Sequence, residues 1–233
     1  MISWRGRVIR FHLAMTLIAL GVTWLFFQSI AADTPDPSGS IAIESVRYQF
    51  VPEYQNGPPP SDDSTWKPIT LPHRVDQLGR SQNGYYWYIF DVVIPEGSQI
   101  DSIYIPRAAA NAEVFVDGRS AGFTGRLEGD KIERNWNRPL LVSSEATLQQ
   151  PGRHTIAIQV RVYGRYFSGL TSIWVGNDDA IRKAHASRTF NQIHLVAAST
   201  AMMVAAALGY LMLWAFPATR QPILLWLVVG GAF

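Results

Sequence analysis

A long apolar run near the C-terminal end constrains this 233-residue chain more than any other feature of its sequence. From Ile193 to Phe216 the sequence contains no Asp, Glu, Lys or Arg. About 20 apolar residues suffice for a helix to cross the hydrocarbon core of a bilayer. Small residues, which let helices approach closely in lipid, recur along the run at Ala198, Ser199, Ala201, Ala205, Ala206 and Gly209. The sequence therefore predicts a transmembrane helix over residues 189–216 that belongs to a bundle.

A second apolar stretch, Leu13 to Phe27, follows the basic residues Arg5, Arg7 and Arg10 near the N-terminus. Basic residues, an apolar stretch and then small residues form the pattern of a signal peptide. The run extends to about 20 residues, which would also suffice for an uncleaved anchor. Residues 1–32 are therefore predicted to be a signal peptide or an N-terminal transmembrane anchor. Either one exports the segment that follows.

A third apolar run begins after a short polar segment and stops at the last residue of the sequence. Residues 217–222 contain Arg220 and two prolines, and Ile223–Phe233 is apolar again. A helix over this last run would rise only about 16 Å, which is too short to cross a bilayer. We expect residues 217–222 to be a cytoplasmic loop and residues 223–233 to begin a second transmembrane helix. The chain is then the front part of a longer multi-pass protein.

The charge distribution does not favour a nucleic-acid partner, although the pI is near 9.0. Residues 33–189 hold 16 of the 20 basic residues and all 18 acidic residues, so their formal charge is 16 − 18 = −2. The excess positive charge lies beside the apolar ends, where basic residues set membrane topology. The absence of Cys excludes a disulfide scaffold and a Cys-based zinc site.

The middle of the chain shows the alternation that is typical of β-strands. One face of a strand is expected at Tyr86, Tyr88, Phe90, Val92 and Ile94, and another at His154, Ile156, Ile158, Val160 and Val162. Shorter strands are expected over residues 41–51, 66–71, 101–105, 112–116, 140–142 and 170–175. Asp117-Gly118 is a hairpin signal. About eight closely spaced strands without intervening amphipathic helices predict an all-β antiparallel jelly-roll sandwich over residues 33–188, followed by transmembrane α-helices.

The sequence contains none of the short motifs that identify common catalytic sites. It has no G-x-S-x-G, no Gly-rich phosphate loop and no H-E-x-x-H, and its five histidines are not paired at ligand spacing. We therefore expect no catalytic residue, no metal and no cofactor. Spacing alone does not exclude the paired carboxylates of a glycosidase, because the fold brings such a pair together.

Two loops carry the best candidates for ligand contacts. In residues 134–139 the Asn and Arg side chains supply directional hydrogen bonds and the Trp a flat apolar face, which suits a polar ring-shaped ligand or a carboxylate. The alternative is a loop that locks against the sandwich. Residues 163–169 could cover a pocket or contact the membrane bundle, and Arg107 could be an anion contact or a surface residue. The candidate ligand-binding residues are Arg107, Asn135, Trp136, Arg138, Tyr163 and Tyr166.

Several short stretches resemble a known family of sugar-binding domains. They are Trp66, Leu71–His73, Gly84–Tyr88, Val114–Gly118 and Gly122. They resemble the jelly-roll domain that precedes the catalytic barrel in β-galactosidase-type enzymes, within the galactose-binding-like superfamily. This resemblance implies a carbohydrate as one class of ligand.

A second resemblance is more particular. Arg134–Leu140, Val160–Gly164 and Gly169–Gly176, followed by an apolar helix, resemble bacterial membrane sensor histidine kinases. More broadly they are similar to the seven-transmembrane receptors with diverse intracellular signalling modules. In that family an extracytoplasmic jelly roll senses a ligand, and the helices carry the signal to a cytoplasmic kinase or cyclase. The phospho-accepting His and the ATP-binding module lie outside these residues, so no kinase activity is assigned to them.

The resemblance implies a periplasmic sensory input module in the bacterial inner membrane. It is expected to contact the membrane and a second copy of itself in a receptor homodimer. Its expected ligand is either a small molecule, such as a carbohydrate, or a periplasmic protein. The linker over residues 178–188 would pass on the difference between two receptor conformations as a helix shift. The first alternative is a carbohydrate-binding module of a membrane-tethered glycosidase. The second is a structural module that mediates dimerisation or recognises a periplasmic protein.

Overall fold

The computed structural model describes most of the middle of the chain and one C-terminal helix. The described residues are 39–74, 83–98, 100–108, 111–129, 133, 135, 138–143, 148, 150–163 and 169–215, with the single positions 16, 17, 21 and 24. The predicted cytoplasmic loop and second transmembrane helix, and all but those four positions of the predicted signal peptide or anchor, lie outside them. The chain divides into one unit of Thr34–Thr189 and another of Met1–Asp33 with Phe190–Phe233. Each unit is described by itself.

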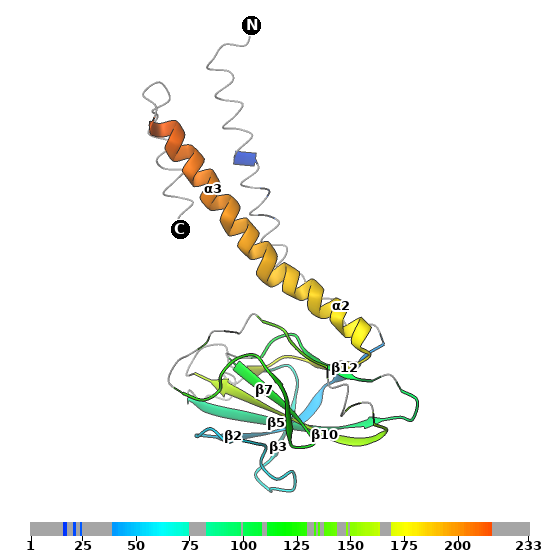
Figure 1. Ribbon diagram of the computed structural model, residues 1–233. Helices are drawn as coiled ribbons and strands as arrows, with labels where there is room; N and C mark the ends of the chain where they lie inside the picture. Colours follow the sequence, from blue (N-terminus) through cyan, green and yellow to red (C-terminus); the bar gives the residue numbers. More distant parts are fainter. Residues whose placement is uncertain are drawn as a thin grey trace. The chain divides into compact units, whose positions relative to one another are not determined.

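A six-stranded antiparallel sheet forms the larger layer of the first unit, in the order β3-β2-β5-β10-β7-β8 (Figure 1). Its strands are β2 (Ser45–Val51), β3 (Lys67–Thr70), β5 (Gly84–Ile94), β7 (Asn111–Val116), β8 (Arg119–Phe123) and β10 (Gly152–Val162). The two central strands, β5 and β10, pair along their whole length, from Gly152 opposite Ile94 to Val162 opposite Gly84. Both had been expected from the alternation of apolar residues.

A four-stranded antiparallel sheet in the order β1-β12-β6-β9 forms the second layer. Its strands are β1 (Ile41–Ile43), β6 (Ser102–Ile105), β9 (Leu140–Ser143) and β12 (Ile173–Gly176). A two-stranded pair, β4 (His73–Arg74) with β11 (Gly169–Leu170), completes the unit. The prediction of an antiparallel all-β sandwich is confirmed.

Two predicted strands are each divided in the structure. Residues 41–51 form β1 and β2, which belong to different sheets, and the chain changes sheet at Glu44. The Glu44 carbonyl accepts a hydrogen bond from the Leu71 amide at 2.8 Å, which continues the register of the β2–β3 pairing by one residue. Residues 169–176 likewise divide into β11 and β12.

The main core fills the space between the two larger sheets. The predicted inward residues of β5, from Tyr86 to Ile94, join those of β10 in one buried cluster. The opposite face of β5 is also buried, since Tyr85, Trp87 and Ile89 pack with Leu127 in a second cluster. A strand buried on both faces is typical of a central strand whose outer face is covered. Here residues from the segments after β2 and β8 supply part of that cover.

The chain enters and leaves the sandwich through adjacent strands. β1 pairs with β12, with Ile41 opposite Val175. Next to this pair, Ser40 lies so close to Gly176 that a Cβ at Gly176 would be 2.6 Å from the Ser40 Oγ. A glycine is therefore required at position 176, where these two segments lie side by side.

Helix α2 (Asp178–Thr189) follows β12 and packs on β6, β9 and β12. Its buried residues Ile181 and Ala184 contact Tyr104, with Leu141 and Trp174 packed around them. The sequence had suggested a short helix in this linker.

The described part of the second unit is helical. The five-residue π-helix Phe190–His194 leads directly into helix α3 (Leu195–Ala215). Within the described residues, one helix is long and apolar enough to cross a membrane. The Ser199 hydroxyl donates to the Leu195 carbonyl at 2.7 Å and the Thr200 hydroxyl to Val196 at 2.9 Å. These hydroxyls are thus satisfied within the helix.

The hairpin between β7 and β8 provides a test of a local ion pair. Asp117 and Gly118 have φ of 49° and 78°, as the hairpin signal predicted. The Asp117 carboxylate lies 2.7 Å from the His154 Nδ1 and accepts from the Thr155 amide at 2.9 Å. The hydrogen bond to Asp117, followed by that to the Gln150 carbonyl, raises the pKa of His154.

We expect Asp117→Asn to destabilise the protein most at acidic pH. Because the pKa of His154 is raised, its contribution is full below the ordinary histidine pKa of about 6.5 and is lost as pH rises through the folded pKa. Asn tolerates the positive φ, so the change isolates the charge. Chemical unfolding of the chain in detergent, followed by Trp fluorescence across pH, measures this. An equal loss of stability at all pH values would contradict it.

Candidate functional site

Several strand ends meet at one end of the six-stranded sheet. Val51 lies opposite Tyr85, Gly84 opposite Val162, and Arg161 opposite Asn111. β2 and β10 therefore end where β5 and β7 begin. We call this the loop end, defined by Val51, Gly84, Asn111 and Val162. Chain connections put residues 106–110, 124–139 and 163–168, which contain all six sequence candidates, between strands that begin or end near it.

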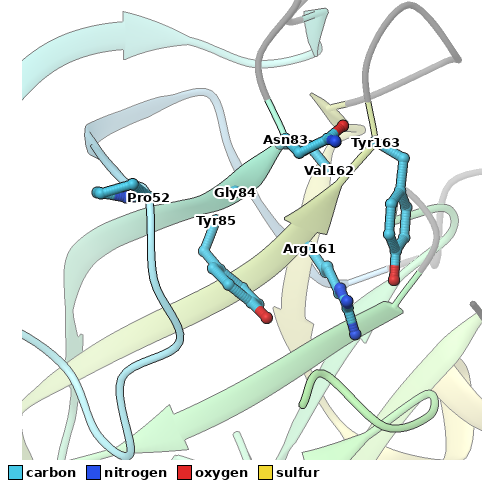
Figure 2. Close-up of a pocket in the computed structure, with 7 residues that line it drawn as sticks. All are labelled: Pro52, Asn83, Gly84, Tyr85, Arg161, Val162 and Tyr163. Atoms are coloured by element: carbon cyan, nitrogen blue, oxygen red, sulfur yellow. The ribbon is translucent and has the colours of Figure 1, made fainter. Parts of the chain in front are cut away.

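A cavity of about 180 Å³ lies at the loop end. Tyr85, Arg161 and Tyr163 line it, together with Pro52, Asn83, Gly84 and Val162. Figure 2 shows the Arg161 side chain between the rings of Tyr85 and Tyr163, with both hydroxyls and the guanidinium pointing in a similar direction. The guanidinium carbon lies 4.8 Å from the Tyr163 ring centroid and 5.8 Å from that of Tyr85. Both distances fall within the range of cation–π contacts.

Gly84 forms part of the cavity rim because no larger residue fits there. Its φ is 156°, and a Cβ would lie 2.7 Å from the Phe50 ring and 2.9 Å from the Val51 carbonyl oxygen. The first residue of β5 must therefore lack a side chain for β2 and β5 to pair at the loop end.

The Leu127 carbonyl fixes the segment after β8 above the sheet. It accepts hydrogen bonds from the Tyr85 hydroxyl at 2.8 Å and from Arg161 Nη1 at 2.7 Å. Burial raises the pKa of the Tyr85 and Tyr163 hydroxyls, although the positive charge of Arg161 opposes the shift. Both phenols are therefore protonated at neutral pH and can donate hydrogen bonds.

A polar network lies beside the cavity on the neighbouring strand. Asn135 Nδ2 donates to Asn111 Oδ1 at 3.0 Å, and Asn111 Nδ2 donates to the Arg126 carbonyl at 2.6 Å. Glu133 Oε2 accepts from the Arg126 amide at 3.3 Å and from Asn135 at 3.4 Å. The amide of Asn135 is thus committed to holding the loop, as the locking alternative for this segment implied.

The other candidates do not line the cavity or lie outside the description. Arg107 is exposed and exchanges hydrogen bonds with Thr171 through its backbone, at 3.0 Å and 3.1 Å. Arg138 is exposed, and its amide donates to the Asn135 carbonyl at 2.9 Å. Trp136 and Tyr166 lie outside the described residues. Tyr163 is the one candidate that the structure describes at the cavity wall.

Sequence reasoning missed Tyr85 and Arg161. Tyr85 lies on the face of β5 opposite to the alternating residues Tyr86 to Ile94, and it packs in the second buried cluster as well as lining the cavity. Arg161 occupies the alternate face of β10 with Ala157 and Gln159, a face that alternation alone assigns to solvent. The sequence did contain one signal for this site. Arg161 is a charged residue at the last position of the Ala157–Gln159 face, directly before the loop that begins at Tyr163.

Pro139, just before β9, also contacts helix α2. The His185 ring hydrogen-bonds to the Pro139 backbone and lies edge-on to Tyr104 at 6.2 Å. Burial, with Arg182 nearby, lowers the pKa of His185 despite that hydrogen bond. At the start of α2, the Asp178 carboxylate accepts from Ser102 and Ser143 at 2.8 Å and pairs with Arg182.

Across the part of the chain that the structure describes, no three His, Cys, Asp or Glu side chains gather as a metal site. The described arrangement can hold a small polar molecule but offers no activated nucleophile.

Comparisons with known proteins give only distant structural similarity. No family model matches the chain, and no curated protein matches it. Among solved structures, an uncultured Clostridium sp. β-glucuronidase is similar at 12% identity and a TM-score of 0.41, over 63% of this chain and 31% of that one. A Faecalibacterium prausnitzii β-glucuronidase gives 11% and 0.44, over 63% and 33%. A Ruminococcus gnavus β-glucuronidase gives 15% and 0.43, over 62% and 29%.

The chain thus spans about a third of the length of these enzymes. All of these TM-scores lie below 0.5, and no conclusion about this chain is drawn from the likeness. The resemblance to sensor histidine kinases gains no support from any of the comparisons and stays a prediction.

We expect Tyr85→Phe to destabilise the protein by about 1 kcal/mol, because it removes one donor from the buried Leu127 carbonyl. Amide hydrogen exchange in residues 124–129 should become faster. Tyr163→Phe is the matched control, since its hydroxyl has no hydrogen-bond partner among the described residues. Equal effects of the two variants on stability would show that the Leu127 contact contributes nothing.

Proposed function

We propose that residues 33–188 are a non-catalytic ligand-recognition module, and that it serves as the extracytoplasmic input part of a bacterial transmembrane signalling receptor. The proposal extends to a sensor histidine kinase as the parent protein. The observation that carries it is a pair of contacts from one loop: Asn135 donates to Asn111 at the loop end, and the Pro139 backbone hydrogen-bonds with His185 of helix α2. The apolar helix α3 follows α2 in the chain with only the five residues of the π-helix between them.

The proposed mechanism needs two states of the module that differ in how α2 is held. A ligand can shift such an equilibrium only if it binds the two states with different affinity. A ligand at the loop end changes the contacts of Tyr85, Arg161 and the segment that they fix. Arg138 and Pro139 then carry the change to His185, and α2 shifts along the four-stranded sheet.

The alternative is a carbohydrate-binding module of a membrane-tethered glycosidase. The feature that favours it is the pair of tyrosine rings at the cavity, since sugar rings pack on aromatic faces. The sequence of the full-length gene product would discriminate between the two, because a glycosidase requires a barrel with two acidic residues. A receptor requires further membrane helices and an output module.

The location of the sandwich can be tested by labelling, because the chain contains no Cys. We expect Arg119→Cys, at the exposed β7–β8 hairpin, to react with a membrane-impermeant maleimide in intact spheroplasts. Ala218→Cys, in the predicted cytoplasmic loop, should react only after the membrane is permeabilised. Labelling of the Arg119 variant only after permeabilisation would place the sandwich in the cytoplasm and end the receptor proposal.

The attachment of α2 gives a second test. We expect Asp178→Asn to weaken the hold of α2 on β6 and β9 by about 1–2 kcal/mol, so that the amides of α2 exchange about ten-fold faster. Burial opposes the shift, but hydrogen bonds from Arg182, Ser102 and Ser143 lower the pKa of Asp178. Its contribution is therefore present above about pH 4 and lost as pH falls through the folded pKa.

Asp179→Asn is the matched control for this experiment, because it removes the adjacent carboxylate. It should leave α2 exchange unchanged. If Asp178→Asn also leaves α2 exchange unchanged, the carboxylate does not anchor the helix and the proposed route of coupling is wrong.

A further inference from the structure

Arg161 carries a positive charge that has no ion-pair partner among the described residues. The ion pairs within the described residues use the carboxylates of Asp91, Asp117 and Asp178, and none of these pairs includes Arg161. Glu128 and Glu133 act electrostatically on the tyrosines beside Arg161 but form no ion pair with it. A guanidinium has five N–H donors. The contact to the Leu127 carbonyl uses Nη1, which leaves the donors of Nη2 and Nε at the cavity.

The Tyr163 hydroxyl is a second unused group at the same cavity. Its oxygen is buried, and it has no hydrogen-bond partner within the described residues. Buried hydroxyls in proteins are nearly always hydrogen-bonded. Figure 2 shows this hydroxyl on the side to which the guanidinium end of Arg161 points. Among the described residues, the cavity therefore presents a cation without an ion-pair partner and a phenol without a hydrogen-bond partner.

The size of the cavity limits the molecule that could satisfy these donors. Its volume of about 180 Å³ corresponds to roughly ten water-sized volumes. Pro52 and Val162 contribute to the lining near the charged group. A small organic molecule with one strongly accepting group fits this combination better than a long polymer.

We propose, building on the ligand-recognition function above, that the cavity binds the carboxylate of a small organic acid through Arg161 and the Tyr163 hydroxyl. The planar guanidinium fork matches the two oxygens of a carboxylate, and such charge-assisted bonds are among the strongest that proteins form. One cation matches a single negative charge, whereas a phosphate dianion would require a further cation. The flanking rings hold the guanidinium in a fixed plane.

Calorimetry of the full chain in detergent micelles tests the proposal. The probes are sodium butyrate and sodium benzoate, which each carry one carboxylate, with butyramide and benzamide as neutral counterparts of similar shape. We expect the acids to bind at least about ten-fold more tightly than the amides, as the loss of a charge-assisted bond implies. Arg161→Gln should weaken binding of the acids by about ten-fold or more, and Arg161→Lys by less, because lysine keeps the charge without the fork.

Two further variants separate binding from folding. Arg161→Gln also releases the Leu127 carbonyl, whereas Tyr163→Phe removes a hydroxyl without a partner and should weaken acid binding several-fold at unchanged stability. Arg153→Gln is the matched control on the same strand. It lies at the far end of β10, pairs with Asp91 and is 72% exposed, so acid binding should be unchanged.

Each outcome decides one point. Equal binding of acid and amide, or full binding by both Arg161→Gln and Tyr163→Phe, would overturn the proposal. Absence of acid binding by the unaltered chain would overturn it as well. If D-galactose binds and the acids do not, the recognition function stands and the carboxylate class is wrong. The labelling experiment at Arg119 tests the receptor role separately.

Discussion

The pairing of β5 with β10 is the contact on which the rest of the structure depends. Both strands have eleven residues, and every residue of one lies opposite a residue of the other. Alternate side chains of β5 enter the main core, where the burial of each large apolar side chain contributes about 1.5–3 kcal/mol. The remaining side chains of its first half are buried on the opposite face. The same two strands therefore hold the sandwich together and form the floor of the loop end.

Loops rather than a third sheet help to cover the outer face of this pair, and polar side chains fix them there. The Trp66 indole donates to the Pro60 carbonyl at 2.8 Å in one covering segment, while Tyr85 and Arg161 donate to Leu127 in the other. The first bond lies within its own segment and braces that loop, whereas the bonds to Leu127 join the second loop to β5 and β10 without ladder hydrogen bonds. The cavity lies beside these attachments, which is why a molecule bound there would bear directly on the position of a loop.

The sequence was sufficient for the long strands and insufficient for their distribution between sheets. Alternation in residues 84–94 and 152–162 predicts two half-buried strands, because each has an apolar side at every second position. No local signal shows that residues 41–43 pair with β12 while residues 45–51 pair with β5, since those partners lie far away in the chain. β8 was missed because Arg-Ser-Ala-Gly-Phe contains no β-branched residue. Arg161 was missed for a related reason: its partners, Leu127 and Tyr85, come from distant segments.

The close approach of Ser40 to Gly176, at the shared end of β1 and β12, has a mechanical consequence. The chain enters by β1 and leaves by β12, and these strands are antiparallel neighbours whose outer ends coincide. A force that separates the segments before Ser40 and after Gly176 therefore loads the β1–β12 hydrogen bonds one at a time, as in peeling, rather than all together in shear. The β1–β12 seam contains three residue pairs, while β12 is also held by its pairing with β6 and by the packing of helix α2 on β6 and β9. The strands β5 and β10 belong to the other sheet, so neither of them pairs directly with the two strands at which the chain enters and leaves.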